Sequence, residues 1–134
     1  MWTNNEIKNK IYNAIKGTDL YNEIVSKGGR VYKESRPSNS KKEDIVISVL
    51  SNQNAMYQPA IVNVNIYVQD IQRGNDFIEN EQRLSTLSKL SVNLFKEIVS
   101  NDCLIRLDKL DVFKLNEIHE HCVNNRLILT ILNL

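Results

Sequence analysis

The chain has 134 residues, of which 42% are hydrophobic and 25% are charged, a composition typical of one globular domain. Seventeen Lys and Arg against sixteen Asp and Glu give a net charge of +1, which lacks the basic excess of a nucleic-acid binder, so we expect no specific nucleic-acid partner. Because the sequence has neither an apolar run of about 18 residues nor the pattern of a signal peptide, we expect no membrane partner and a cytoplasmic location.

Two helices are predicted near the start of the chain. Thr3 and Glu6 have the spacing of a capping box, in which each side chain satisfies a backbone N–H group at a helix start. Isoleucines then recur every four residues and predict a helix with one apolar stripe that ends at Gly17. These are Ile7, Ile11 and Ile15. A second, short helical turn covers residues 19–26, and we expect the pair Gly28-Gly29 to end it with left-handed backbone.

Strands are predicted next. Residues 30–34 favour a short strand, and residues 35–44 have the Pro, Ser and charge content of a solvated loop. Residues 45–50 are β-branched, and residues 60–70 alternate between apolar and polar side chains, as a strand with one buried face does. The expected buried residues of the second strand are Val62, Val64, Ile66 and Val68. We expect the two strands to form an antiparallel hairpin with a turn-rich connection over residues 51–59.

The second half of the chain predicts one long helix and further strands. Residues 76–100 have the helical period and predict a single helix, about 37 Å long at 1.5 Å per residue. Residues 103–107 and 110–115 are two short strands or one strand with a bulge, and residues 126–134 predict a central strand that is apolar on both faces. The prediction is therefore one α+β domain over residues 1–134, an antiparallel β-sheet with an N-terminal helix and one long helix packed on one face.

One segment has metal-ligating residue types. In a strand, His119 and His121 would point to the same side and could share a Zn²⁺ ion. Together with Cys122 they define an alternative function, a small cytoplasmic metal-binding or enzymatic domain. The spacing matches no closed set of four zinc ligands, so a polar turn with partly exposed histidines is the simpler interpretation. We therefore expect no metal and no cofactor.

Other chemical signals in the sequence are weak. Cys103 and Cys122 are expected to be buried, reduced thiols, because the chain shows no signal peptide. The glycine-rich phosphate loops, the acyl-transfer motif and the zincin motif are missing from the sequence. Carboxylates scattered among lysines are typical of a solvated face. We therefore expect a protein that is not an enzyme.

Charge is unevenly distributed along the chain. Residues 27–42 contain six basic residues and one acidic residue, a net charge of +5. Residues 70–81 contain four acidic residues and one basic residue, a net charge of −3. This polarity favours head-to-tail contact between identical subunits, which makes a ring if the rotation closes.

The order of the predicted elements, with a strand that opens at Gly29-Arg30-Val31-Tyr32, resembles the small tail-completion or tail-terminator proteins of long-tailed bacteriophages. The resemblance covers most of the chain. It implies a non-catalytic viral structural protein whose hexameric ring caps the tail tube and joins it to the head connector. Its partners would be further copies of itself, the tail tube protein and head connector proteins, and it would be found in the virion tail or neck after assembly in the host cytoplasm. A head-completion or connector protein is the alternative of the same class, and a regulatory partner-binding module of a bacterial cell is a third possibility.

On this resemblance, residues 36–44 and 51–59 are candidate assembly loops. Their candidate interface residues are Arg36, Lys41, Lys42, Met56 and Tyr57. Met56 and Tyr57 are either exposed apolar residues of the kind enriched at interfaces, or residues that fold back on the sheet.

Overall fold

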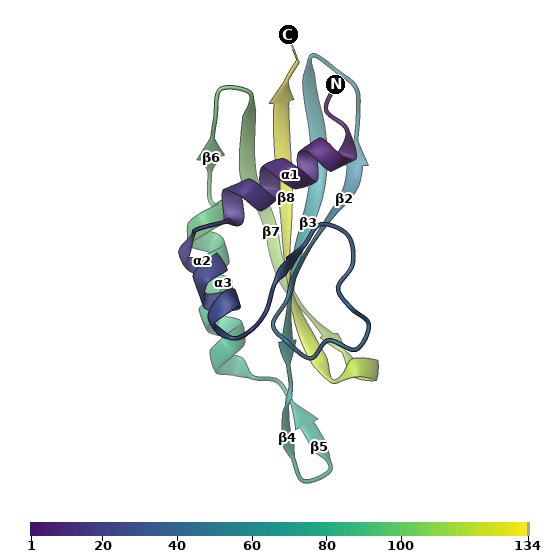
Figure 1. Ribbon diagram of the computed structural model, residues 1–134, viewed down its shortest axis with the longest axis vertical. Coiled ribbons are helices and arrows are strands. Elements are labelled where there is room, and N and C mark those ends of the chain that lie inside the picture. The colour runs from purple at the N-terminus through teal and green to yellow at the C-terminus, as the bar shows by residue number, and fades with distance from the viewer. Residues whose placement is uncertain (134) are drawn as a thin grey trace.

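The structure, a computed structural model that describes residues 1–133, is an α+β fold built on a curled, mostly antiparallel sheet of six strands (Figure 1). The described residues form the helices α1 (Asn4–Ile15), α2 (Asp19–Ser26) and α3 (Glu81–Phe95) and the short 3₁₀ helix η1 (Asn116–Ile118). The sheet has the order β1 (Val31–Tyr32), β2 (Ile45–Asn52), β3 (Tyr57–Gln69), β8 (Glu120–Leu132), β7 (Cys103–Leu115) and β6 (Ile98–Val99). The strands β4 (Ile71–Arg73) and β5 (Asp76–Ile78) form a separate hairpin. The predicted α+β class is confirmed.

The two predicted N-terminal helices are confirmed, and the capping box forms as expected. The Thr3 hydroxyl accepts a hydrogen bond from the Glu6 N–H, and the Glu6 carboxylate accepts one from the Thr3 N–H, both at 3.2 Å. Gly28, which follows α2, is left-handed with a φ of 82°, whereas Gly29 is not left-handed. Gly29 is required for another reason, because a Cβ there would lie 1.9 Å from the backbone oxygen of Glu43.

The predicted hairpin of β2 and β3 is confirmed, but its connection is shorter than expected. Asn52 pairs with Ala60, so the ladder extends past residue 50, and β3 already begins at Tyr57. The expected buried side chains at alternate positions of β3 are all at most 1% exposed: Val62, Val64, Ile66 and Val68.

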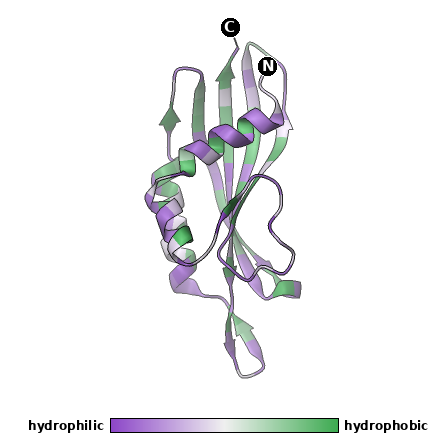
Figure 2. Cartoon of the chain, viewed as in Figure 1, coloured by the Kyte–Doolittle hydropathy of each residue, from purple (hydrophilic) through white to green (hydrophobic). Residues whose placement is uncertain are grey.

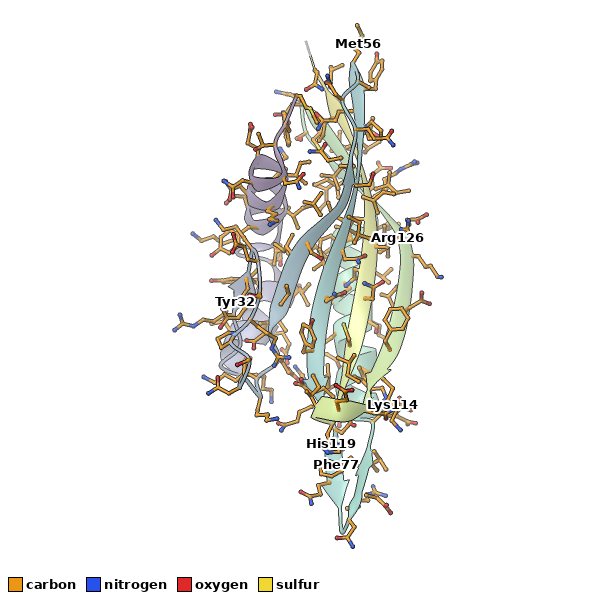
Figure 3. All side chains as sticks on the ribbon, turned by 90° about the vertical axis from the view of Figure 1, so that its right-hand side faces the viewer. Tyr32, Met56, Phe77, Lys114, His119 and Arg126 are labelled. Atoms are coloured by element: carbon orange, nitrogen blue, oxygen red, sulfur yellow. The ribbon has the colours of Figure 1, made fainter. Side chains whose placement is uncertain are left out.

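The sheet has two unlike faces. The buried residues of β3 and their β8 partners define the inner face, and the apolar ones among them form one cluster with residues of α1, α2 and α3. The opposite, outer face carries the intervening residues, which are half-buried or exposed for most of their length. Figure 3 shows Arg126, an outer-face residue, pointing to the side of the strands away from α1. The strand colours in Figure 2 alternate in agreement with this division.

The prediction of one helix over residues 76–100 is wrong. The segment divides into β5, α3 and β6, so α3 is about 22 Å long at 1.5 Å per residue. The helix begins late because the Asn80 side chain accepts a hydrogen bond from the Arg83 N–H and caps α3 there. Phe77 and Ile98 match the helical period by coincidence and lie in strands. Gly74, with a φ of 60°, makes the tight turn between β4 and β5.

The C-terminal strands settle the alternative that the sequence leaves open. β7 is one strand whose pairing with β8 shifts between Leu107 and Lys109, which is a bulge. β8 is longer than the predicted strand over residues 126–134, because it begins at Glu120, and Leu134 lies outside the described residues. Cys103 and Cys122 are buried and free, as expected.

Candidate functional site

The three residues of the alternative zinc site, His119, His121 and Cys122, do not converge. His119 ends η1 in a left-handed conformation with a φ of 54° and is exposed, so it is not part of the strand that begins at Glu120. His121 lies on the inner face and is buried, and Cys122 lies on the outer face because successive strand residues alternate. The alternative in which both histidines point to the same side of one strand is therefore wrong. The simpler interpretation, a polar turn with partly exposed histidines, holds for His119 but not for His121, which is buried. Within residues 1–133, no group of three or more His, Cys, Asp or Glu is placed to hold a metal ion.

The two histidines instead hold the hairpin of β4 and β5 against the end of the sheet. His121 Nδ1 lies 2.6 Å from Asp70 Oδ1, and His121 Nε2 lies 3.8 Å from Glu79 Oε2. The Asp70 N–H donates to the carbonyl of His119 at 2.9 Å. The His119 ring stacks on the Phe77 ring with a centroid separation of 3.7 Å. The hairpin, residues 71–78, projects beyond the end of the sheet (Figure 1), and we call it the arm.

Replacing His121 by Phe is expected to loosen the base of the arm. The Asp70 side chain is 3% exposed, and the change removes the ring nitrogen that it contacts. Because a buried polar group that loses its partner destabilises the fold, we expect the free energy of unfolding to fall by about 1–3 kcal/mol. We also expect faster amide exchange over residues 70–79.

The matched control is Lys114→Met, because Lys114 is the β7 neighbour of His121 and is exposed. It is expected to change stability by less than about 0.5 kcal/mol. Urea unfolding and hydrogen exchange measure both effects. If His121→Phe leaves amide exchange in the arm at the wild-type rate, the contact with Asp70 does not hold the arm.

The Arg36 side chain is mostly buried and does not face solvent. Its side chain is 11% exposed, with Nε 3.1 Å from Asp44 Oδ2 and Nη1 3.0 Å from Glu120 Oε1. The guanidinium also lies 4.3 Å from the centroid of the Tyr67 ring, and burial raises the pKa of Tyr67. Arg36 therefore fastens the loop of residues 35–44 to the first residue of β8, and we do not count it among the outward-facing cations.

Lys41 and Lys42, the other two basic candidates, are exposed. They belong to a set of exposed cations that we call the basic rim: Lys27, Arg30, Lys33, Lys41 and Lys42. A pocket of about 610 Å³, the basic pocket, opens beside this rim between α1, α2 and the start of β1. Among its lining residues are Tyr12, Tyr21, Val25, Arg30 and Lys42.

Met56 and Tyr57 project into solvent at the end of the sheet opposite the arm. Their exposed fractions are 67% and 65%, so they do not fold back on the sheet. Figure 3 shows Met56 at one end of the molecule and Phe77, in the arm, at the other. On the outer face, the half-buried Leu132 pairs with Tyr57, and the half-buried Ile61 lies four residues further along β3.

The arm and the contact between Asp70 and His121 are features that the sequence analysis missed. The pair Gly74-Asn75 between short β-prone runs is a hairpin signal that could have indicated the arm. No comparable signal exists for Asp70 and His121, which are 51 residues apart.

Burial raises the pKa of the Cys103 thiol to about 11 and that of the Cys122 thiol to about 12. Both thiols are therefore protonated at neutral pH and poorly nucleophilic.

Comparison with known proteins gives no family for the chain. No protein-family model matches it, and no curated protein matches it. Within residues 1–133, no helix has both the length and the apolar character needed to span a membrane.

Proposed function

We propose that this chain is a structural subunit of a long-tailed bacteriophage, a tail terminator or tail-completion protein. It assembles into a ring, hexameric in the family it resembles, that caps the tail tube and joins it to the head connector. The observation that carries the proposal is the exposure of large apolar side chains at both projecting ends of the sheet.

The first of these ends is the tip that connects β2 and β3. Met56 and Tyr57 are adjacent and each is about two-thirds exposed, at 67% and 65%. Aromatic residues and Met are enriched in protein interfaces, where their burial supplies much of the binding energy. The tip therefore supports a role in contact with another subunit.

The second end is the arm, whose two isoleucines, Ile71 and Ile78, are 41% and 36% exposed. The outer face of the sheet between the two ends supports the same role, because Ile61 and Ile128 lie on it only half-buried. Apolar side chains that gather at projecting ends are typical of an interaction site.

The element order that underlies the resemblance is retained in the fold at most positions. The helical turn that ends at Gly28, the strand at Val31–Tyr32, the long antiparallel strands and the helix α3 follow one another along the chain. A head-completion or connector ring is the alternative within the same class, and the partner that the ring binds distinguishes the two.

The solution mass of the purified protein tests the proposal first, by light scattering over a range of protein and salt concentrations. We expect a species of six 15.5 kDa chains, either alone or on addition of tail tubes, with rings visible by electron microscopy. Co-sedimentation with tail tubes or with head connectors then identifies the partner. A protein that stays monomeric and binds neither structure contradicts the proposal.

Replacing Met56 and Tyr57 together by Ser is expected to weaken ring formation. Interface residues of this kind contribute about 2 kcal/mol or more, which is about 30-fold in the association constant. The matched control is Val99→Ser, because Val99 is 70% exposed but lies on the edge strand β6, three strands across the sheet from β3. Light scattering measures both variants, and unchanged assembly of a folded double variant rejects the role of the tip.

A further inference from the structure

The arm is a short hairpin with little support of its own. Its strands have three residues each, so it projects by roughly 10 Å at 3.3 Å per residue. An isolated two-stranded hairpin is marginally stable at best in water. The arm is attached at its base through Asp70 and Phe77, while Ile71 and Ile78 remain exposed. An arm of this kind gains stability when another surface covers it.

The arm itself is neutral, with Asp76 against Arg73, but two further carboxylates, Glu79 and Glu81, follow it directly in the chain. Residues 71–81 contain Asp76, Glu79 and Glu81 against Arg73, a net charge of −2. Asp76, Glu79 and Glu81 are all exposed. Asp70 is not part of this set, because its carboxylate is buried against His121.

The basic pocket is complementary to this region, because it combines apolar side chains with positive charge. Its apolar part includes Val25, which is 46% exposed, and its charged part is Arg30 and Lys42. The nearby carboxylates of Glu23 and Glu43 are each 2.6 Å from Arg83 of α3 and are already paired. The basic rim around the pocket therefore keeps a positive charge that faces solvent.

We propose that the arm of one copy docks in the basic pocket of the next copy. Within one chain the two surfaces lie apart, since the arm extends from the end of the sheet and the pocket opens on the flank formed by α1 and α2 (Figures 1 and 3). Contact between unlike surfaces of identical chains is head-to-tail, and it closes into a ring when the rotation allows. The carboxylates of Asp76, Glu79 and Glu81, in the arm and directly after it, are opposite in charge to Arg30 and Lys42 of the pocket and would orient the contact. This inference rests on the proposed assembly function and names the contact that builds the ring.

Disulfide trapping in the full chain tests the contact. The double variant Asn75→Cys/Val25→Cys places one thiol at the tip of the arm and one at the pocket, and the native thiols stay unreactive because they are buried. On oxidation of the concentrated protein, we expect a ladder of covalent multimers that a reductant removes. The matched control is Asn75→Cys/Val99→Cys, whose second position is more exposed than Val25, at 70% against 46%, but lies on β6.

Charge reversal gives a second readout in the same trapping variant. Arg30→Glu with Lys42→Glu is expected to lower the yield of the ladder by about tenfold, and adding Asp76→Lys in the arm with Glu79→Lys directly after it is expected to restore the yield. A ladder that the control pair forms equally well, or no ladder at all in concentrated protein, overturns the inference.

The outcomes separate this inference from the proposed function. A ring that forms on tail tubes without trapping between arm and pocket overturns the inference alone. A ladder that forms in a protein with no affinity for tail tubes or connectors supports the contact and overturns the phage function. Absence of the ladder, of the ring and of tail binding overturns both.

Discussion

Replacing Arg36 by Met is expected to lower the free energy of unfolding by about 3–5 kcal/mol, because the change leaves two buried carboxylates without their cation. Asp44 and Glu120 are each 1% exposed, and both contact the Arg36 guanidinium. Stabilities of domains of this size are about 5–15 kcal/mol, so the loss is a large part of the total. Urea unfolding measures it directly.

Two controls identify the cause of that loss. The triple variant Arg36→Met/Asp44→Asn/Glu120→Gln removes the buried charges together and is expected to recover most of the stability, because no uncompensated charge remains. Lys41→Met changes an exposed residue of the same loop and is expected to cost less than about 0.5 kcal/mol. If Arg36→Met and Lys41→Met destabilise equally, the buried cluster does not hold the loop.

The position of Arg36 also bears on assembly. The loop that it fastens carries Lys41 and Lys42, and Lys42 lines the basic pocket. The Arg36 guanidinium donates to the carbonyl oxygens of Ser40 and Lys42, both at 3.0 Å. Arg36 therefore holds the loop segment that carries Lys41 and Lys42, two of the rim cations, and its loss is expected to affect trapping between arm and pocket as well as stability.

Local signals in the sequence predicted the elements that depend on near neighbours. The hydrogen bonds between Thr3 and Glu6 and the spacing of Ile7 and Ile11 determine α1 within one or two helical turns. The alternation along β3 likewise places Val64 and Ile66 on the buried face without reference to distant residues.

Contacts between distant residues were not predictable in the same way. Arg36 and Glu120 are 84 residues apart, so in the sequence Arg36 is indistinguishable from a solvated cation of a basic loop. The exposure of Met56 and Tyr57 was an open alternative for the same reason, because burial depends on the fold around the tip.

Over residues 76–100 two local signals conflicted, and the helix-capping residue, not the helical periodicity, determined where the helix begins. Residues 76–100 carry enough apolar side chains at helical spacing to predict one helix, but Gly74 and Asn80 impose a turn and a helix start that periodicity does not detect. Gly74 makes the turn of the arm and Asn80 starts α3 after it, so the largest error in the predicted fold coincides with a candidate functional feature.

Replacing Phe95 by Ala is expected to destabilise the fold by about 3–5 kcal/mol, because it deletes a large buried side chain and leaves a cavity. Phe95 is 0% exposed and belongs to the core cluster that joins α3 to the inner face. The matched control is Val92→Ala in the same turn of α3, where Val92 is 43% exposed, and its expected cost is below about 1 kcal/mol. Urea unfolding measures both variants, and equal losses contradict the placement of Phe95 in the core.

Phe95→Ala also tests whether a loss of stability by itself affects the contact between arm and pocket. Phe95 is the last residue of α3, whereas the arm precedes its first turn, about 22 Å away at 1.5 Å per residue. At a temperature where Phe95→Ala remains folded, we therefore expect disulfide trapping between arm and pocket to give the same yield as in the trapping variant that retains Phe95. A loss of trapping in the folded Phe95→Ala protein would show that the arm depends on the packing of the whole helix, and the contacts at its base through Asp70 and His121 would then be insufficient to position it.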